Sequence, residues 1–208
     1  PLIDIDIMNP ADWEAGEGYH WTGDASMAFA FNRGNTETDE FDLKVNSVLE
    51  SAVNRYTFNG HFERDEAHNR VVEGDREVTQ SIMTADNWKL LGKYDYFLTD
   101  PINYLGANAS LEADALAGVK LRTYAGPYYG RKLLDNDDYK LDGELGIAYV
   151  STEYDADVNQ EDNNYTGLNW NVTGESSILG GDSRLYLRHI GLIDISDSDQ
   201  LILKNTLG

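Results

Sequence analysis

The connections between the predicted β-strands of this chain alternate between short and long, and this restricts the fold more than any single motif. Apolar and polar residues alternate with period two in about ten segments between residues 19 and 208, as in strands with two different faces. Short connections are predicted at 51–54, 99–101, 134–138 and 179–182. Long, acidic connections are predicted at 34–40, 64–86, 113–117, 152–165 and 194–199. Such unequal rims are typical of an up-and-down antiparallel membrane barrel.

The first 18 residues differ from the rest of the chain. Apolar residues alternate with aspartates from Leu2 to Ile7, and Asn9-Pro10 then breaks the run. We interpret residues 1–18 as a tail or linker, with the alternative that it adds a strand to a partner's sheet. Residues 19–208 are predicted to form one barrel domain. Because Pro1 is not a natural start, we expect a processed or cropped chain.

Composition narrows the classes of function. The formal net charge is −21, which argues against nucleic-acid binding because that requires clustered Lys and Arg. There is no cysteine, so no disulfide framework or thiolate metal site is available. No apolar run reaches the ~20 residues of a transmembrane helix. A transmembrane barrel remains compatible, because only alternate residues of its strands touch lipid.

One face of nearly every predicted strand is polar and carries both signs of charge. Alternation alone leaves open whether that face is inside a membrane barrel or outside a soluble one, and the unequal connections favour the membrane barrel. The polar residues then face the lumen, and opposite charges are expected to pair there. The predicted lumen-facing residues are Lys44, Glu63, Lys93, Asp95, Arg122 and Glu144.

Aromatic residues are predicted to form two girdles around an apolar band, as in membrane barrels. The alternative is that Tyr and Trp are simply good strand formers. The girdle near the short connections comprises Tyr19, Trp21, Tyr56, Tyr94, Tyr96, Tyr104, Tyr128, Tyr129 and Tyr139. The girdle toward the long connections comprises Phe31, Phe62, Trp88, Tyr149, Tyr154 and Tyr165.

Several short motifs carry a family resemblance. Gly-Asn-Thr-Glu-Thr stands at 34–38, Thr-Ala-Asp-Asn-Trp at 84–88 leads into Tyr-Asp-Tyr-Phe-Leu-Thr-Asp at 94–100, and Ala-Gly-Pro-Tyr stands at 125–128. In this order and spacing they resemble the YdiY-like family of salt-induced outer-membrane proteins, a domain family of unknown function, over roughly Trp21 to Gly208. The resemblance implies an outer-membrane barrel of about twelve strands, with a link to salt or envelope stress. It carries no catalytic residues.

The C-terminal end departs from the family pattern. The family's domain continues further, and membrane barrels typically close with a strand that ends in an aromatic residue, whereas this chain ends in Leu207-Gly208. The last predicted strand, 201–207, is also shorter than the ~9–11 residues that cross a bilayer. We therefore expect about ten of the twelve strands in these residues, and no closed barrel from them alone.

Catalytic and metal motifs are sparse. His20, His61, His68 and His189 lie on different segments, and no nucleophile elbow, P-loop or dinucleotide fingerprint is present. We therefore expect no enzymatic activity and no cofactor. The segment 155–166 begins like a calcium loop but has Gln160 and Thr166 where an EF-hand needs Gly and Glu. It is predicted at most as a weak Ca²⁺ or Mg²⁺ site, with the solvated loop as the alternative; its ligands would be Asp155, Asp157, Asn159 and Asp162.

The sequence thus predicts an all-β, antiparallel up-and-down transmembrane β-barrel in a bacterial outer membrane, in contact with lipid. Its expected role is structural or a narrow solute pathway. One alternative is a soluble, lipocalin-like barrel whose apolar rows point inward around a small ligand. Another is a subunit of a larger envelope assembly, with an envelope protein partner or a homo-oligomer.

Overall fold

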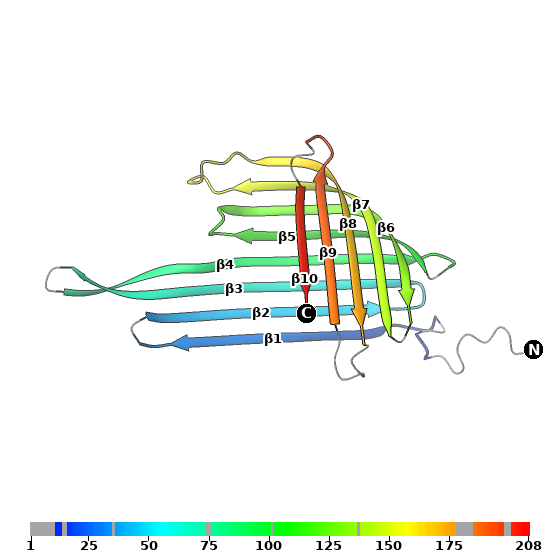
Figure 1. Cartoon of the computed structure of the whole chain (residues 1–208), viewed down its shortest axis with the longest axis horizontal. Coiled ribbons are helices and arrows are strands. Elements are labelled where there is room, and N and C mark those ends of the chain that lie inside the picture. Colours follow the sequence, from blue (N-terminus) through cyan, green and yellow to red (C-terminus); the bar gives the residue numbers. More distant parts are fainter. Residues whose placement is uncertain are drawn as a thin grey trace, which may run out of the picture.

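A single antiparallel sheet accounts for all the regular structure that is described. The computed structural model describes residues 11–13, 16–34, 36–73, 76–100, 102–136, 138–177, 185–197 and 201–208. Ten strands in these residues follow one another in the sheet in chain order (Figure 1). The strands are β1 His20–Asn32, β2 Thr36–Glu50, β3 Asn54–Glu73, β4 Arg76–Phe97, β5 Asn103–Asp114, β6 Val119–Asp135, β7 Tyr139–Tyr154, β8 Asn163–Ser176, β9 Leu185–Asp194 and β10 Leu201–Leu207. The predicted all-β, up-and-down arrangement is confirmed.

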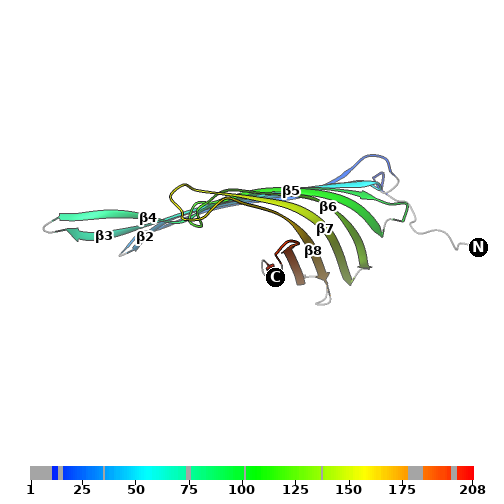
Figure 2. The same ribbon diagram turned by 90° about the horizontal axis from the view of Figure 1, so that it is seen from above.

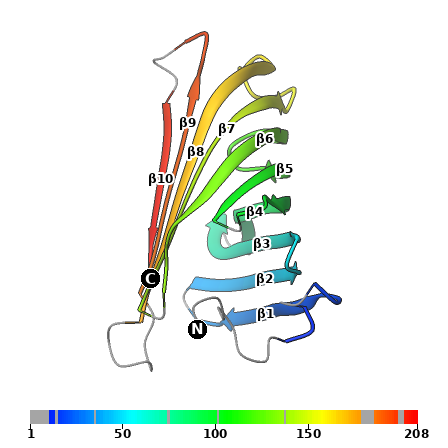
Figure 3. The same cartoon turned by 90° about the vertical axis from the view of Figure 1, so that its right-hand side faces the viewer.

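The sheet is curved but open. Figures 2 and 3 show strands β1 to β5 as one wall of a trough and β6 to β10 turning across it. The edges are β1 and β10, and in the described residues no backbone pairing joins them. The predicted closed barrel is therefore not formed by this part of the chain, as the short final strand led us to expect. The predicted strand segment Leu2–Ile7 lies outside the described residues.

The two faces of the sheet differ in exposure. We call the face with Phe31 and Leu145 the convex face, and the face with Asp95 and Tyr104 the concave face. On the convex face Phe31 and Leu145 are 65% and 54% exposed, although both are large and apolar. On the concave face Asp95 and Tyr104 are 1% and 0% exposed, because inward-pointing side chains of a curved sheet crowd together. The sheet thus shows apolar residues outward and encloses polar ones.

The predicted long connection 64–86 is wrong, because it forms the outer half of a hairpin. Strands β3 and β4 pair from Asn54↔Tyr96 out to Glu73↔Arg76, with one bulge next to Glu66 (Figure 1). Both faces of this outer part meet solvent, so apolar residues do not alternate there and the strand pattern is lost. The unequal rims therefore come mainly from strand length. The segment between β7 and β8 remains a loop, as predicted.

The hairpin of β5 and β6 places two tyrosines opposite two glycines. Its turn ends at Gly118, whose φ of 65° is readily adopted only by glycine. The resulting register pairs Tyr104 with Gly130 and Gly106 with Tyr128. Because glycine has no side chain, each tyrosine ring lies over the facing glycine and reaches one strand further. The two rings meet edge to face, with centroids 6.4 Å apart at 87°.

This arrangement corrects the predicted aromatic girdle. Tyr104 and Tyr128 belong to the concave core, where Tyr128 is 4% exposed. Their positions along β5 and β6 are at the height of the girdle, but both residues lie on the polar face of the sheet. Other members of both girdles are exposed: Tyr19, Trp21, Phe31, Tyr56, Tyr94, Tyr96, Tyr129, Tyr139 and Tyr149.

We predict that Gly106→Ala destabilises the fold by about 1–3 kcal/mol, the usual cost of overpacking a filled site. A Cβ at Gly106 would overlap the Tyr128 ring, whereas a Cβ at Gly92 on β4 would meet nothing within 4 Å. Gly92→Ala is therefore the matched control. Urea titrations of the two variants should differ clearly in midpoint. Equal midpoints would show that the Tyr128 ring does not require the absence of a side chain at position 106.

Candidate functional site: the central polar cluster

The centre of the concave face holds a group of paired charges and tyrosines, which we call the central polar cluster. Five adjacent strands, β3 to β7, each contribute to it, and the register brings their side chains to one face. Hydrogen bonds and ion pairs link its members into two connected halves, one around Asp95 and one around Glu144. The members are Arg55, Lys93, Asp95, Tyr104, Tyr128 and Glu144.

The first half is built around the carboxylate of Asp95. The Arg55 Nε donates to Asp95 Oδ2 at 2.8 Å, and the Tyr128 hydroxyl, reaching over Gly106, donates to Oδ1. The Arg55 guanidinium also lies 5.7 Å from the Phe97 ring centroid and 5.5 Å from that of Tyr104. Both carboxylate oxygens thus have partners, which offsets the cost of removing this charge from water.

The second half is built around Glu144, whose side chain is 8% exposed. Lys93 Nζ donates to Glu144 Oε1 at 2.7 Å, and the Tyr104 hydroxyl, reaching over Gly130, donates to the same oxygen at 3.1 Å. Asn171 Nδ2 donates to Oε2 at 3.0 Å. Lys93 Nζ also lies 4.9 Å from the Tyr128 ring, which connects the two halves. Lys93 therefore joins β4 to β7 across the trough.

A third group lies nearer the opposite rim, around Glu112 of β5. Lys89 Nζ and Arg122 Nη1 approach its two oxygens at 2.5 and 2.8 Å, and Arg122 Nε donates to Thr152 Oγ1 at 3.2 Å. These side chains are more exposed than the central cluster, Lys89 being 52% exposed. Exposed pairs contribute little to stability, so this group serves mainly to fill and neutralise the concave face.

The predicted polar residues lie on one face but are not all brought together. Lys93 and Glu144 form a direct ion pair, and Asp95 adjoins them through Tyr128. Arg122 belongs to the Glu112 group. Lys44 pairs with Asp42 of its own strand at 2.9 Å and is 53% exposed, while Glu63 accepts from Asn87 at 3.0 Å.

Sequence reasoning missed several members of the cluster. Arg55 was not predicted, and Tyr104 and Tyr128 were predicted as girdle residues, because each belongs to the cluster only through a partner on another strand. Asn171 of β8, which donates to Glu144 from outside the cluster, was missed for the same reason. The sequence does carry one usable signal. A Tyr-x-Gly triplet occurs at 104–106 and again at 128–130, at equal distances on either side of the turn, so antiparallel pairing must set each tyrosine against the other's glycine.

Among the residues that the structure describes, three buried side-chain oxygens on the concave face lack a protein partner: Asn108 Oδ1, Asp142 Oδ1 and Asn169 Oδ1. Buried acceptors of this kind are normally satisfied by ordered water. Their presence beside the central polar cluster indicates a polar, hydrated interior. The neighbouring charges Lys93 and Glu144 are paired with each other, so the centre of the concave face is packed with paired polar groups.

The surroundings of His61 and His189 place them on opposite faces of the sheet. His61, on the concave face, contacts Asp42 Oδ2 at 3.2 Å. His189 lies on the convex face between Trp170 and Asn205, in contacts of 3.0 and 2.7 Å. Since the Trp170 indole N–H can only donate, His189 Nε2 accepts and its Nδ1 carries the proton toward Asn205. His189 is thus hydrogen-bonded at both nitrogens on an apolar face.

The predicted cation loop lies between β7 and β8. In the described part of the chain no three acidic or histidine side chains gather in a metal-binding arrangement. Asp162 Oδ1 instead accepts from the Tyr154 backbone N–H at 2.9 Å, and the Asp155 carbonyl accepts from Val158 N at 3.0 Å. These bonds shape the loop between β7 and β8.

The far rim of the convex face is charged. The Arg33 Nη1 donates to Asp39 Oδ1 at 2.5 Å, and this hydrogen bond lowers the pKa of the Asp39 carboxyl below its usual value. The same guanidinium lies 5.8 Å from the Phe31 ring. Where β1 meets β2, the change from an exposed aromatic ring to an ion pair therefore takes place within a few residues.

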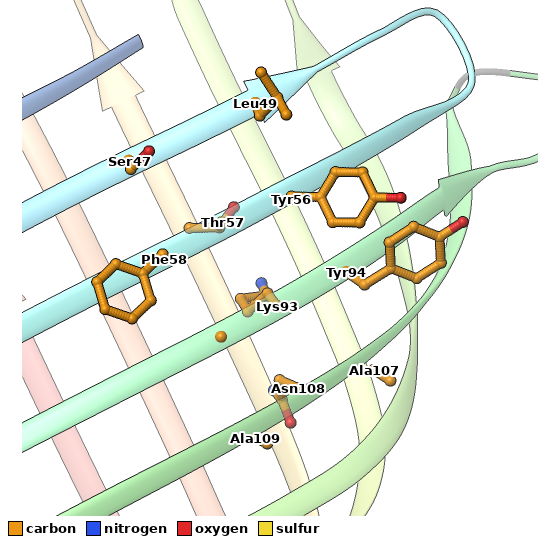
Figure 4. A pocket seen from close by; sticks show the side chains of 11 residues that line it. Ser47, Leu49, Tyr56, Thr57, Phe58, Lys93, Tyr94, Ala107, Asn108 and Ala109 are labelled. Carbon is orange, nitrogen blue, oxygen red and sulfur yellow. The ribbon is translucent and has the colours of Figure 1, made fainter. Parts of the chain in front are cut away.

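A shallow groove of about 510 Å³ lies on the convex face across β2 to β5. Figure 4 shows the Tyr56, Phe58 and Tyr94 side chains around it, and Gly92 is also among the residues that line it. Lys93 is the one charged residue among those that line it, and its ammonium is bound to Glu144 on the other face. The groove is thus apolar and offers no reactive groups.

We predict that Glu144→Gln destabilises the fold by about 3–5 kcal/mol, because it leaves the enclosed Lys93 charge unpaired. Glu153→Gln is the control, since the Lys120–Glu153 pair is long at 3.7 Å and both side chains are at least half exposed. Chemical denaturation should separate the two variants. Equal effects would show that the Lys93 charge is stabilised by water and does not depend on the Glu144 carboxylate.

Comparison with known proteins gives the family but no activity. The part of the chain that the structure describes contains no apolar helix of membrane-spanning length. No curated protein matches the chain. The family model described as "Protein of unknown function, DUF481" matches residues 25–208, which include all of β2 to β10. The chain therefore belongs to the DUF481 family, consistent with the resemblance noted from its motifs.

Proposed function

We propose that this sheet is most of a bacterial outer-membrane β-barrel, with the convex face in lipid and the concave face lining the lumen. One observation carries the proposal: large apolar side chains are exposed on the convex face while charged groups are enclosed on the concave face. A soluble sheet buries its apolar face instead. In a membrane, the exposed rings and aliphatic side chains of the convex face would contact lipid and would not be exposed to water.

The height of the apolar band supports this proposal. From Trp21 to Phe31, β1 places only Gly or apolar residues on the convex face. This distance is about 34 Å along the strand, or about 26 Å along the membrane normal for a strand tilted by about 40°. The apolar band of outer-membrane barrels is ~25 Å tall. On the neighbouring strands the apolar run ends earlier, since Asp39 of β2 lies opposite Phe31 and Arg64 of β3 lies opposite Phe41. These charged residues mark the edge of the band, as expected near a membrane surface.

The open edges require completion in this setting. Unpaired backbone groups on β1 and β10 would each cost several kcal/mol in hydrocarbon. Further strands that pair with these edges would close the barrel, and about twelve strands in total suit its size. An envelope protein that supplies the missing strands is the second candidate, favoured by the same two open edges.

The lipocalin-like alternative finds no support in the geometry. It requires the apolar rows to point into the trough around a ligand. Leu105 and Ile147, which belong to those rows, are about half exposed on the convex face. Weak binding of divalent cations to the acidic rim, and a link with salt or envelope stress, remain proposals that rest on the loop composition and on the family resemblance.

We expect the full-length protein to fractionate with outer membranes and to require detergent for extraction. Within such a preparation, Leu145→Arg should cost about 2–4 kcal/mol, because it places a charge near the bilayer midplane. Leu116→Arg is the control, since Leu116 is equally exposed but lies in the turn between β5 and β6. Folding yields in lipid vesicles measure the difference. A detergent-free soluble protein that tolerates Leu145→Arg would overturn the proposal.

We also expect the barrel to conduct poorly. The Lys93–Glu144 pair and the two tyrosines occupy the centre of the concave face. Replacing Lys93 and Glu144 together by alanine removes the pair without leaving a single enclosed charge, so the current should rise. Planar-bilayer recordings of the full-length protein test this expectation. Large, stable currents from the wild type would contradict a filled lumen.

A further inference from the structure

The outer part of β4 has a free backbone edge. On one side β4 pairs with β3 over its whole length, but on the other side its pairing with β5 begins only at Asn87. The Ala115 N–H bonds to the Asp86 carbonyl at 3.0 Å, which marks the last contact on that side. From Val78 to Ala85 the described residues therefore present an unpaired strand edge on the projecting hairpin (Figures 1 and 2).

This free edge lacks the usual protection against strand pairing. Exposed edges are normally blocked by charges, proline or irregular geometry. Residues 78–85 read Val-Thr-Gln-Ser-Ile-Met-Thr-Ala, without charge or proline, whereas the covered partner segment 64–73 contains several charged residues. The only bulge falls at Thr84, near the inner end. Val78 and Ile82 are 43% and 45% exposed on this edge.

The free edge is complementary to a second copy of itself. In an antiparallel pairing centred on Gln80, Val78 of one copy faces Ile82 of the other, and the two Gln80 side chains face each other. Cross-strand apolar pairs of this kind stabilise a sheet, and directly opposed like charges destabilise it. Because each chain carries a net charge of −21, two copies repel each other except through an uncharged contact.

We propose that two copies of this chain associate through the free edge of β4, residues 78–82, in an antiparallel pair centred on Gln80. Backbone hydrogen bonds supply the association and the Val78–Ile82 contacts fix the register. Because the two β4 strands would run antiparallel, the remainder of the sheet in each copy would lie at opposite ends of the paired edge. Two barrels in facing membranes would have this arrangement. The association itself does not depend on the proposed membrane location.

The absence of cysteine from the chain allows a direct test by cross-linking. In detergent-solubilised full-length protein, Gln80→Cys should form a disulfide-linked dimer under mild oxidation, because the two positions lie directly opposite. Thr79→Cys is the control, since Thr79 faces Ser81 of the other copy and lies diagonal to its own equivalent. Non-reducing gels and sedimentation velocity measure the dimer. No dimer for Gln80→Cys, or equal cross-linking for Thr79→Cys, overturns the proposal.

A charge exchange provides a second test without cysteine. Gln80→Lys and Gln80→Glu should each abolish the dimer, because like charges then face each other. An equal mixture of the two variants should restore it. Because Gln80 is exposed, both variants should keep the wild-type melting temperature. A wild type that stays monomeric at all concentrations excludes a second copy as the occupant, and an unchanged dimer in Gln80→Lys excludes this edge.

Discussion

The exchange of tyrosines across β5 and β6 is the interaction on which the rest of the sheet depends. Tyr128 leaves β6, passes over Gly106 of β5 and binds Asp95 of β4. Tyr104 leaves β5, passes over Gly130 of β6 and binds Glu144 of β7. Each bond spans three strands, so four strands are fixed in register at one level. A slip of one residue would turn both rings to the convex face.

The same exchange explains how a concave face can be filled with charges. Removing a carboxylate from water is costly unless its oxygens are bonded. The tyrosine hydroxyls supply bonds from neutral groups, and Arg55 and Lys93 supply the opposite charge. The rings also cover these pairs, which strengthens them by excluding water. The tyrosine rings thus exclude water from the concave face, as an apolar core does in other proteins. The apolar residues of the convex face are therefore not needed to form a core.

Much of the fold could be predicted from period-two alternation, but only where the two faces meet different surroundings. Between Phe41 and Leu49 the alternation indicated strand β2 correctly. The outer parts of β3 and β4 were not predicted as strands. Residues such as His68 and Ser81 bond to each other on a solvated face there, so apolar residues do not recur with period two. In the candidate site, the pairing of Lys93 with Glu144 could not be predicted, since it joins strands that are not neighbours.

The distribution of charge follows from the same constraint. Lysines and arginines are few in this acidic chain, and several of those on the concave face are bound to carboxylates such as Glu112 and Glu144. Acidic residues in excess of these pairs must lie where water screens them, and the loop at 155–162 carries several. Such a rim repels anionic lipid headgroups as well as other copies of the chain. An uncharged strand edge beyond that rim is consequently the place where a close contact between two copies costs least.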